Sequence, residues 1–361
     1  MKAVVVDAIG EFSVQEISLD PPKAGEVMVD IKATGVCRSD LHIINGTIPV
    51  EFPIVLGHEG AGVVVEVGAG VEHLAPGDHV VLSFIPNCGE CFYCEHEQAN
   101  LCSSKDDARG YMLDGTSRVH RGEEELKVMT QLGCMAERCV APAISCIKID
   151  PDVPLTSAAL IGCGVMTGVG AALNTAEVEA GSTVAVFGCG GIGLSIVQGA
   201  RIAGAGQVIA VDTMESKLEL ARGFGATHGI TLEQAQEYIL DLTEGRGADY
   251  CFEAVGIGSL METAEACTRP GGTCTVVGVG SLDDQLILSP FTLPIHGKRI
   301  LGSMYGGCNP NRDFPRLLDF YQQGRLDLDG MITNTYSIDQ AVQAFTDLEA
   351  GANARGVIVY D

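Results

Sequence analysis

The sequence is poor in positive charge. Its 361 residues include 22 Lys and Arg against 47 Asp and Glu, which gives a formal net charge of −25 and a pI near 4.5. Proteins that bind nucleic acid or anionic membrane surfaces concentrate basic residues where they meet phosphate groups. The shortage of positive charge therefore argues against both kinds of partner.

The sequence also lacks long hydrophobic runs and a secretory leader. No apolar run reaches the roughly 20 residues that a membrane-spanning helix needs. The N-terminal stretch MKAVVVDAIGEFSVQEI has no apolar core followed by a cleavage site, and it reads as a β-strand. We therefore expect a cytoplasmic protein, whose thiols stay reduced.

No internal repeat or low-complexity linker interrupts the chain, which is long enough for two domains. Residues 1–164 contain short apolar runs separated by Gly, Pro and Asp, which predicts a β-rich domain. Residues 165–304 alternate apolar strands with helices, the pattern of a parallel sheet built from βαβ units. Residues 305–361 contain two amphipathic helices and a closing strand. The predicted fold class is α/β, with a doubly wound parallel sheet beside a β-rich domain.

Four cysteines gather in the segment NCGECFYCEHEQANLC, which is Asn87 to Cys102. A reducing compartment disfavours disulfides, and cysteines so close in the chain rarely bridge. Four thiolates on a short segment suit a tetrahedral zinc ion with no open position, which is a structural site. We predict Cys88, Cys91, Cys94 and Cys102 as its ligands, and the alternative is a set of buried cysteines without metal.

A second motif, GCGGIG, follows an apolar strand and opens a helix. Gly188, Gly190 and Gly193 form G-x-G-x-x-G, with Gly191 between them, and Asp212 ends the next strand. In this context the pattern is a dinucleotide fingerprint, in which the glycines allow a tight turn, approach of the pyrophosphate and close helix packing.

Asp212 indicates which dinucleotide would bind. Its carboxylate would accept hydrogen bonds from the adenosine ribose, and it would repel the 2′-phosphate of NADP by at most about 4 kcal/mol per pair of unit charges. We therefore predict NAD. Lys217 could reach the same ribose, although spacing alone is equally consistent with an exposed helix lysine.

Three further residues are candidates for a second metal site. Cys37 lies in GVCRSDLHI, His58 in GHEGAG and Cys163 in LIGCGVMTG. Two sulfurs and one imidazole leave the fourth position of a zinc tetrahedron open, as a catalytic site requires. Spacing alone cannot assemble these residues, because Cys163 is far along the chain and a lone Cys or His is more often a core residue.

Taken together and in order, these motifs resemble the zinc-dependent medium-chain alcohol dehydrogenases. The resemblance runs from Met1 to the terminal strand, and YMLDGTSR lies in the longer loop of the branch with animal alcohol dehydrogenases and glutathione-dependent formaldehyde dehydrogenase. It implies a GroES-like catalytic domain at 1–164, a zinc lobe at about 88–102, a Rossmann NAD-binding domain at 165–304 and a return to the catalytic domain at 305–361.

The resemblance implies a role for each residue of the second site. Cys37, His58 and Cys163 would bind the catalytic zinc, so the chain would hold two zinc ions. Glu59 would lie beside the metal and exchange as a transient ligand. Asp40 would hold the second imidazole nitrogen of His58 and fix its tautomer.

It also implies a proton path and cofactor contacts. Ser39 would take the alcohol proton, which would pass through the cofactor ribose to His42 and then to water. The remaining contacts would be Arg38 and Arg355 on the pyrophosphate, with Thr167 and Ile192 on the nicotinamide.

The implied function is reversible oxidation of a primary alcohol to an aldehyde, with hydride transfer to NAD in a dry cleft between the domains. The partners would be a small alcohol or aldehyde and a second copy of the chain, because the long-loop branch is typically dimeric. A tetramer is the alternative.

The substrate follows from two departures from the glutathione-dependent branch. That branch carries an Asp at the pocket mouth and an Arg after the last zinc-lobe cysteine, where this chain has Ile48 and Asp106. Ile48 and Phe84 predict an apolar lining suited to unbranched or aromatic primary alcohols, unless both merely pack the domain.

Two alternatives stay open. A related thiol-dependent branch shares phrases such as IGCGVM, so the chain could act as a formaldehyde dehydrogenase on an S-hydroxymethyl thiol adduct. The other is a dinucleotide-binding relative without catalysis, although such relatives commonly lose the zinc ligands that this chain keeps. The remaining cysteines are interpreted as small buried hydrophobic residues: Cys134, Cys139, Cys146, Cys189, Cys251, Cys267, Cys274 and Cys308.

Overall fold

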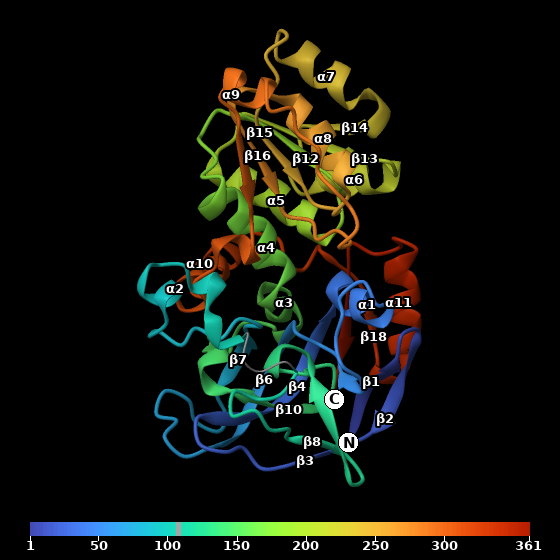
Figure 1. The fold of residues 1–361 in the computed structure, drawn as a ribbon. Coiled ribbons are helices and arrows are strands. Elements are labelled where there is room, and N and C mark those ends of the chain that lie inside the picture. The colour runs from blue at the N-terminus through green and yellow to red at the C-terminus, as the bar shows by residue number, and fades with distance from the viewer. Residues whose placement is uncertain (106–109) are drawn as a thin grey trace. The chain divides into compact units, whose positions relative to one another are not determined.

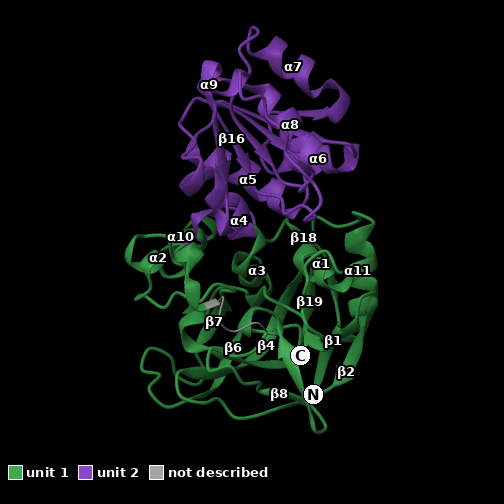
Figure 2. Ribbon diagram, in the orientation of Figure 1, with its two compact units in different colours: residues 1–164, 309–321, 328–361 green, residues 165–308, 322–327 purple. Residues whose placement is uncertain are grey.

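The computed structural model describes residues 1–105 and 110–361 (Figure 1). The chain divides into two compact units (Figure 2). Unit 1 contains Met1–Gly164, Asn309–Tyr321 and Leu328–Asp361, and unit 2 contains Val165–Cys308 and Gln322–Asp327. Residues 305–308 and 322–327 thus group with unit 2, whereas the sequence analysis placed the return to the first domain at 305.

Unit 1 is built on two sheets. The first has the order β2-β1-β5-β9-β8-β3, with β1 (Lys2–Ala8), β2 (Glu11–Glu16), β3 (Ser18–Leu19), β5 (Ile54–Val55), β8 (Val119–Arg121) and β9 (Glu124–Val128). The second has the order β11-β7-β6-β4-β19-β18, with β10 also paired to β4. Its strands are β4 (Glu26–Val36), β6 (Gly60–Val67), β7 (His79–Leu82), β10 (Arg138–Pro142), β11 (Cys146–Lys148), β18 (Ile332–Tyr336) and β19 (Arg355–Val359).

The chain's last strand lies beside one of its first. β19 pairs antiparallel with β4, with Val36 opposite Gly356 and Thr34 opposite Ile358. The C-terminal segment is therefore part of the sheet that precedes Cys37. The helices of unit 1 are α1 (Arg38–Ile44), α2 (Phe92–Glu95), α3 (Leu155–Ala159), α10 (Pro310–Gln322, whose last residue belongs to unit 2) and α11 (Ala341–Glu349).

Unit 2 has one sheet, whose strands are all parallel. Its order is β14-β13-β12-β15-β16-β17, with β12 (Thr183–Phe187), β13 (Gln207–Asp212), β14 (His228–Thr231), β15 (Ala248–Glu253), β16 (Thr268–Val276) and β17 (Arg299–Gly302). Its helices are α4 (Gly164–Gly170, whose first residue belongs to unit 1), α5 (Gly191–Ala203), α6 (Glu215–Gly223), α7 (Ala235–Leu242), α8 (Gly258–Cys267) and α9 (Thr292–His296).

This strand order confirms the predicted fold class. Numbered along the chain, the strands run 3-2-1-4-5-6, the order of a doubly wound dinucleotide-binding sheet. The order reverses between β12 and β15, which is where such sheets bind their ligands. Across the described residues no single helix is long and apolar enough to cross a membrane, although the bent pair Leu155–Gly162 and Gly164–Thr175 passes that test when its parts are joined.

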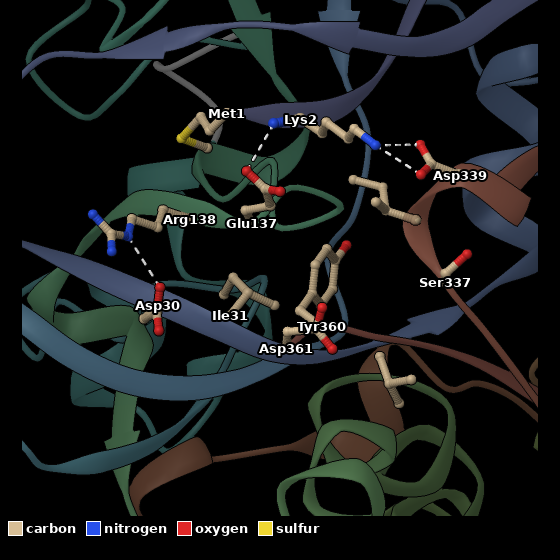
Figure 3. Close-up of a pocket in the computed structure, with 12 residues that line it drawn as sticks. Met1, Lys2, Asp30, Ile31, Glu137, Arg138, Ser337, Asp339, Tyr360 and Asp361 are labelled. Carbon is tan, nitrogen blue, oxygen red and sulfur yellow. Dashed lines mark hydrogen bonds and ion pairs between the residues drawn. The ribbon is translucent and has the colours of Figure 1, made fainter.

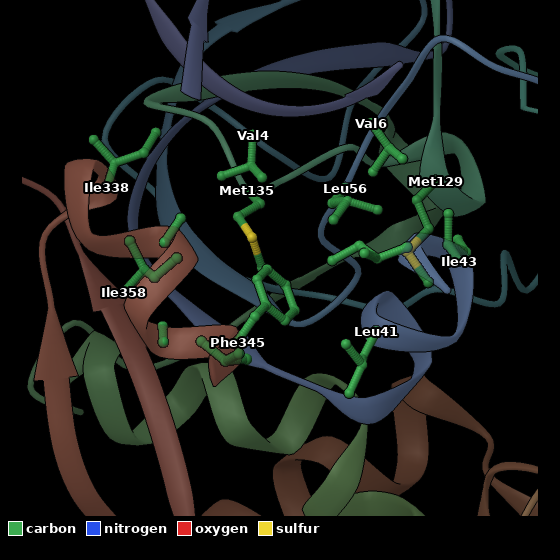
Figure 4. Close-up of a cluster of buried hydrophobic side chains, with 14 of the residues drawn as sticks. Val4, Val6, Leu41, Ile43, Leu56, Met129, Met135, Ile338, Phe345 and Ile358 are labelled. Carbon is green, nitrogen blue, oxygen red and sulfur yellow. The ribbon is translucent and has the colours of Figure 1, made fainter. Parts of the chain in front are cut away.

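One core cluster of unit 1 anchors the segments that carry the predicted site (Figure 4). Leu41 and Ile43 bury the apolar face of α1, and Leu56 lies two residues before His58. Met135 and Ile358 reach the same cluster from the segment before β10 and from β19. Each such side chain contributes about 1.5–3 kcal/mol on burial, so this core fixes α1 and the His58 segment together. The cysteines predicted to be packing residues are all buried, which confirms that interpretation.

A buried ion network in unit 1 was missed by the sequence analysis. The guanidinium of Arg118 is 1% exposed and donates to both carboxylate oxygens of Glu26, at 2.9 and 2.6 Å. It also donates to Asp114 Oδ2 at 2.8 Å and to the Ser117 carbonyl at 2.9 Å. These contacts fasten the loop that contains YMLDGTSR to the start of β4.

We predict that Arg118→Met destabilises unit 1 by about 3–5 kcal/mol, because it leaves the buried Glu26 carboxylate without its partner. The measurement is the urea midpoint of the unit 1 transition. The matched control is Arg121→Met, which removes partly exposed contacts with Asp7 at 2.7 Å, Gln15 at 2.6 Å and Glu124 at 2.7 Å and should cost at most about 1 kcal/mol. Equal shifts in the two variants would contradict this prediction.

Candidate functional site

Three residues from distant parts of the sequence meet inside unit 1. Cys37 is the N-cap of α1, His58 lies between β5 and β6, and Cys163 directly precedes α4. Their ligand atoms, two thiol sulfurs and one imidazole nitrogen, all lie within 4.8 Å of one another, and all three residues are buried. The structure thus brings together the set that spacing alone could not assemble.

The surroundings of His58 fit a metal ligand. Asp40 Oδ2 lies 3.3 Å from His58 Nδ1, and Asp40 Oδ1 accepts the Gly57 N–H at 2.9 Å, which holds the carboxylate in place. Both imidazole nitrogens are buried and neither makes a hydrogen bond among the described residues; Nδ1 lies beside the Asp40 carboxylate, which leaves Nε2 without a partner. A buried polar atom without a partner is costly, and a metal ion would satisfy this one.

The two thiols share their protons unequally. The hydrogen bond from Cys163 lowers the pKa of Cys37 well below its usual value, while the same bond raises the pKa of Cys163. Burial lowers the pKa of His58, but the charges of Asp40 and Cys37 outweigh burial, so its net pKa is well above the ordinary value. The thiolate, the form that binds zinc, is therefore favoured at Cys37 and disfavoured at Cys163.

Glu59 connects the segments that carry the three ligands. Its Oε1 accepts the Gly164 N–H at 2.8 Å, its Oε2 is paired with the buried guanidinium of Arg355, and its carbonyl accepts the Gly35 N–H at 2.8 Å. Burial raises the pKa of Glu59 to about 7, although the positive charge of Arg355 opposes this rise. Both carboxylate oxygens are thus occupied within the protein, and its exchange onto a metal stays a prediction, as does the contact of Arg355 with a pyrophosphate.

Two glycines make room for this carboxylate. A Cβ on Gly35 would collide with Glu59 Oε2, and a Cβ on Gly164 would collide with the Arg355 guanidinium. Gly35 lies two residues before Cys37, and Gly164 follows Cys163. The sequence analysis read neither glycine as part of the site, because their role depends on a residue far away in the chain.

The predicted proton path begins on α1. Ser39 Oγ lies 3.8 Å from Cys37 Sγ, and His42 follows one helical turn later on the same helix. Burial, followed by the charge of Arg38, lowers the pKa of His42. The imidazole is therefore neutral near pH 7 and able to accept a proton. Arg38 itself is exposed at the start of α1.

The four-cysteine segment forms the second cluster. The ligand sulfurs lie within 4.8 Å of one another, with Cys88 and Cys102 3.6 Å apart and Cys91 and Cys102 3.9 Å apart. The backbone N–H of Cys94 is the largest cause that lowers the pKa of Cys91 to about 5. Four thiols at these distances fit a closed tetrahedral zinc site.

In unit 2 the Gly-rich turn has the geometry of a dinucleotide cradle. Gly188 has φ +92°, which favours glycine, and a Cβ on Gly193 would collide with the Gly188 carbonyl. Gly190 is different, because a Cβ there would meet nothing within 4 Å. The space in front of Gly190 and the N-terminus of α5 fit a bound pyrophosphate.

Asp212 and the predicted nicotinamide contacts lie on elements that adjoin this turn. Asp212 accepts the Cys189 N–H at 2.8 Å and the Met214 N–H at 3.0 Å, so its carboxylate is held beside the Gly-rich turn. Lys217 is half-buried on α6. Gly168, which follows Thr167 on α4, lies close to Ile192 on α5, because a Cβ on Gly168 would be 2.5 Å from the Ile192 carbonyl oxygen.

The structure gives contacts for two of the residues on which the substrate prediction rests, Phe84 and Ile48. The Phe84 ring packs edge-on against the His58 imidazole, with centroids 5.7 Å apart and an interplanar angle of 84°. Ile48 packs against the core cluster of Figure 4, and its N–H binds the His42 carbonyl at 2.9 Å. Asp106 lies outside the described residues. The roles of Ile48 and Phe84 in substrate binding stay predictions.

A separate pocket of about 420 Å³ lies beside the N-terminus (Figure 3). Its two basic side chains are each paired with a carboxylate of the lining. Lys2 Nζ binds both carboxylate oxygens of Asp339, at 2.8 and 2.7 Å, and Arg138 Nε binds Asp30 at 3.0 Å. It contains none of the predicted site residues. One lining group, the Tyr360 hydroxyl, is buried and has no hydrogen-bond partner among the described residues.

Comparison with known proteins gives the family. Residues 23–151 match the model of the alcohol dehydrogenase GroES-like domain, and residues 191–323 match that of the zinc-binding dehydrogenases. The chain is 41% identical to an NDMA-dependent alcohol dehydrogenase of Amycolatopsis methanolica, covering 99% of this chain and 98% of that one. It is 40% identical to S-(hydroxymethyl)glutathione dehydrogenase of Paracoccus denitrificans, covering 99% of both.

A solved structure agrees over the full length. Benzyl alcohol dehydrogenase from Acinetobacter calcoaceticus has 31% sequence identity and a TM-score of 0.94, over 100% of this chain and 99% of that one. These matches confirm the family that the sequence motifs indicated, and with it an oxidoreductase that acts on alcohols. The chain belongs to the zinc-dependent medium-chain alcohol dehydrogenase family.

Proposed function

We propose that this protein is a cytoplasmic dehydrogenase that oxidises a primary aliphatic or aryl alcohol to the aldehyde with NAD, reversibly, and that it holds two zinc ions per chain. The observation that carries the proposal is the meeting of two buried thiols with a buried imidazole whose Nε2 has no partner among the described residues. That donor set leaves one corner of a zinc tetrahedron open for substrate.

The chain's own residues would prepare the alcohol for oxidation. When bound, zinc supplies Lewis acidity toward the alcohol oxygen, and NAD supplies the hydride acceptor. Ser39 accepts the alcohol proton and His42, neutral at pH 7, delivers it to water. Asp40 orients His58, and Glu59 with Arg355 holds the Cys163 segment in place. Phe84 shields one side of the imidazole from water.

The cofactor half of the proposal depends on unit 2. Gly190 leaves open space in front of the backbone, and Asp212 presents a carboxylate where a ribose would lie. The same carboxylate disfavours a 2′-phosphate, which is why NAD is proposed over NADP.

Free alcohols are favoured over thiol adducts by two residues. Ile48 stands where the glutathione-dependent branch carries a charged group, and Phe84 adds an apolar ring beside His58. Oxidation of a thiol adduct is the second candidate function, because one relative is named S-(hydroxymethyl)glutathione dehydrogenase.

Zinc analysis tests both metal sites. We predict two zinc atoms per chain in the wild type, one in Cys37→Ser and one in Cys102→Ser, because each removes a ligand from a different cluster. Cys37→Ser should lose nearly all turnover, and Cys102→Ser should lower the unfolding temperature. The control Cys146→Ser changes a buried thiol outside both clusters and should keep two zinc atoms. One zinc atom in the wild type would refute the second site.

Gly190 tests the cofactor cradle without disturbing the fold. Gly190→Ala adds a Cβ that meets no protein atom within 4 Å, at a backbone conformation that alanine adopts easily. We predict unchanged thermal stability and an NADH dissociation constant at least tenfold higher, measured by fluorescence titration. The control Gly223→Ala also meets nothing within 4 Å but lies on α6, and it should leave NADH affinity unchanged. Equal affinity in the two variants would count against the proposed pyrophosphate site.

A substrate panel tests the reaction itself. Benzyl alcohol and unbranched primary alcohols are supplied with NAD or NADP, with and without added thiol, beside an assay for dinucleotide that copurifies. We expect turnover without thiol, and a kcat/KM at least tenfold higher with NAD than with NADP. Asp212→Asn should reduce the ratio of kcat/KM with NAD to kcat/KM with NADP. A strict requirement for thiol would favour the second candidate, and equal efficiency with both dinucleotides would overturn the role of Asp212.

We also infer a homodimer joined through the edge of unit 2. β17 pairs only with β16 within the described chain, and the segment before it exposes five large apolar side chains. Their exposed fractions lie between 62% and 85%, and they are Val279, Leu282, Ile287, Phe291 and Ile295. Such a patch beside an edge strand would be protected by a second copy.

The double variant Leu282→Glu with Ile287→Glu should therefore convert dimer to monomer in sedimentation velocity, because it places charge in the apolar contact. Phe92→Glu is the control, since Phe92 is 64% exposed but lies in unit 1. If the double variant keeps the wild-type mass, the patch is not the interface.

A further inference from the structure

A buried carboxylate in unit 2 has no role in the site described so far. Glu253 is the last residue of β15 and is 0% exposed. Charged residues are almost never fully buried without partners. The partners of Glu253 are backbone groups: its Oε1 accepts the N–H groups of Val255, Gly256 and Ile257 at 2.9, 2.7 and 3.4 Å.

These bonds determine the shape of the turn between β15 and α8. Gly256 has φ +94° and is packed so tightly that a Cβ would collide with the Val279 carbonyl oxygen. The main-chain carbonyl of Glu253 accepts the N–H groups of Val277 and Gly278 at 2.9 and 3.1 Å. One residue thus holds the turn after β15 and the end of β16.

The same turn lies against the Gly-rich turn. The Ala254 N–H donates to the Phe187 carbonyl at 2.9 Å, directly before Gly188. A Cβ on Gly188 would collide with the Val255 Cγ2 methyl, so Val255 packs on that glycine. This contact lies between β12 and β15, where the strand order reverses and a doubly wound sheet binds its ligand.

The second carboxylate oxygen marks Glu253 as more than a structural cap. Oε2 is buried and has no hydrogen-bond partner among the described residues. Burial raises the pKa of Glu253, and the N–H groups of the turn oppose that rise. A carboxylate kept in such a place, at the end of β15 beside the Gly-rich turn, fits a functional constraint on that turn.

We propose that Glu253 is a positioning residue for the dinucleotide: its carboxylate gathers three N–H groups of the β15–α8 turn and so sets Val255 against Gly188, fixing the surface on which NAD lies. This inference rests on the proposed use of NAD. Glu253 acts through the turn and touches neither the substrate nor the reacting atoms.

Three substitutions separate positioning from general stability. Glu253→Leu removes the acceptor at similar volume, and Glu253→Asp withdraws it by one methylene. Glu253→Gln keeps an acceptor oxygen for the three N–H groups. Its NH₂ group takes the place of Oε2, which has no hydrogen-bond partner among the described residues. We expect the NADH dissociation constant to rise at least tenfold in Glu253→Leu, about threefold to tenfold in Glu253→Asp, and less than threefold in Glu253→Gln.

The matched control is Asp249→Leu, at the opposite end of the same strand. Asp249 also binds a backbone N–H, that of Thr183 at 2.8 Å, and pairs with Arg269 at 2.5 Å. The Asp249→Leu variant should have a lower unfolding temperature but unchanged NADH affinity and unchanged KM for NAD. The Glu253→Leu and Glu253→Asp variants, in contrast, should raise KM for NAD more than KM for alcohol.

The outcomes are distinguishable. If wild-type protein binds no NADH, the proposed cofactor fails and this inference fails with it. If the wild type binds NADH and Glu253→Asp binds it equally well, only the positioning role is overturned, whether or not Glu253→Leu folds. An equal loss of NADH affinity in Asp249→Leu would also overturn it, because the effect would then be one of general stability.

Discussion

The predicted metal site of unit 1 depends on one buried residue, Glu59. It binds the Gly164 N–H, pairs with Arg355 and, through its carbonyl, holds Gly35. Each of these contacts is one or two residues from a predicted zinc ligand or at the start of β19. Three chain segments far apart in sequence therefore meet, because each supplies a hydrogen bond or an ion pair to Glu59. A buried charge is strongly destabilising when a partner is removed, so the ligand geometry is coupled to the integrity of the pair with Arg355.

Whether a feature rests on neighbouring residues or on distant segments decides whether it could be predicted from the sequence. The strand, Gly-rich turn and helix around Gly188 are determined by neighbouring residues, because positive φ and close packing are local needs. The four-cysteine segment is local in the same way. The fold class followed from the alternation of strands and helices, and the family motifs then identified Cys37, His58 and Cys163 together. Composition and spacing by themselves could not have done so.

The features that escaped prediction are contacts between distant segments. Arg118 looked like a loop residue, and only the folded chain shows it against Glu26. Gly35 and Gly164 carry no signal that a carboxylate and a guanidinium need their space. Glu253 looked like the polar end of an apolar strand, and its three N–H partners become visible only when the turn has formed. Residues 322–327 belong to unit 2 for a similar reason, since Gln198 binds the backbone of Asp327 at 2.8 and 3.1 Å.

The two thiol clusters differ in their burial and in the charged groups around their sulfur atoms. In the four-cysteine lobe Cys88, Cys91 and Cys94 are partly exposed and Cys102 is buried, and the backbone N–H of Cys94 lowers the pKa of Cys91. The Cys37, His58 and Cys163 cluster is buried, and it lies among two carboxylates with Arg355 as the compensating cation. The hydrogen bond between the two sulfurs lowers the pKa of Cys37 and raises the pKa of Cys163. A divalent metal bound here would add positive charge beside these carboxylates and thiols. In the proposed two-zinc enzyme, the four-cysteine lobe would therefore stabilise its metal site with local backbone groups, whereas the metal of the buried site would balance the charges of the surrounding core.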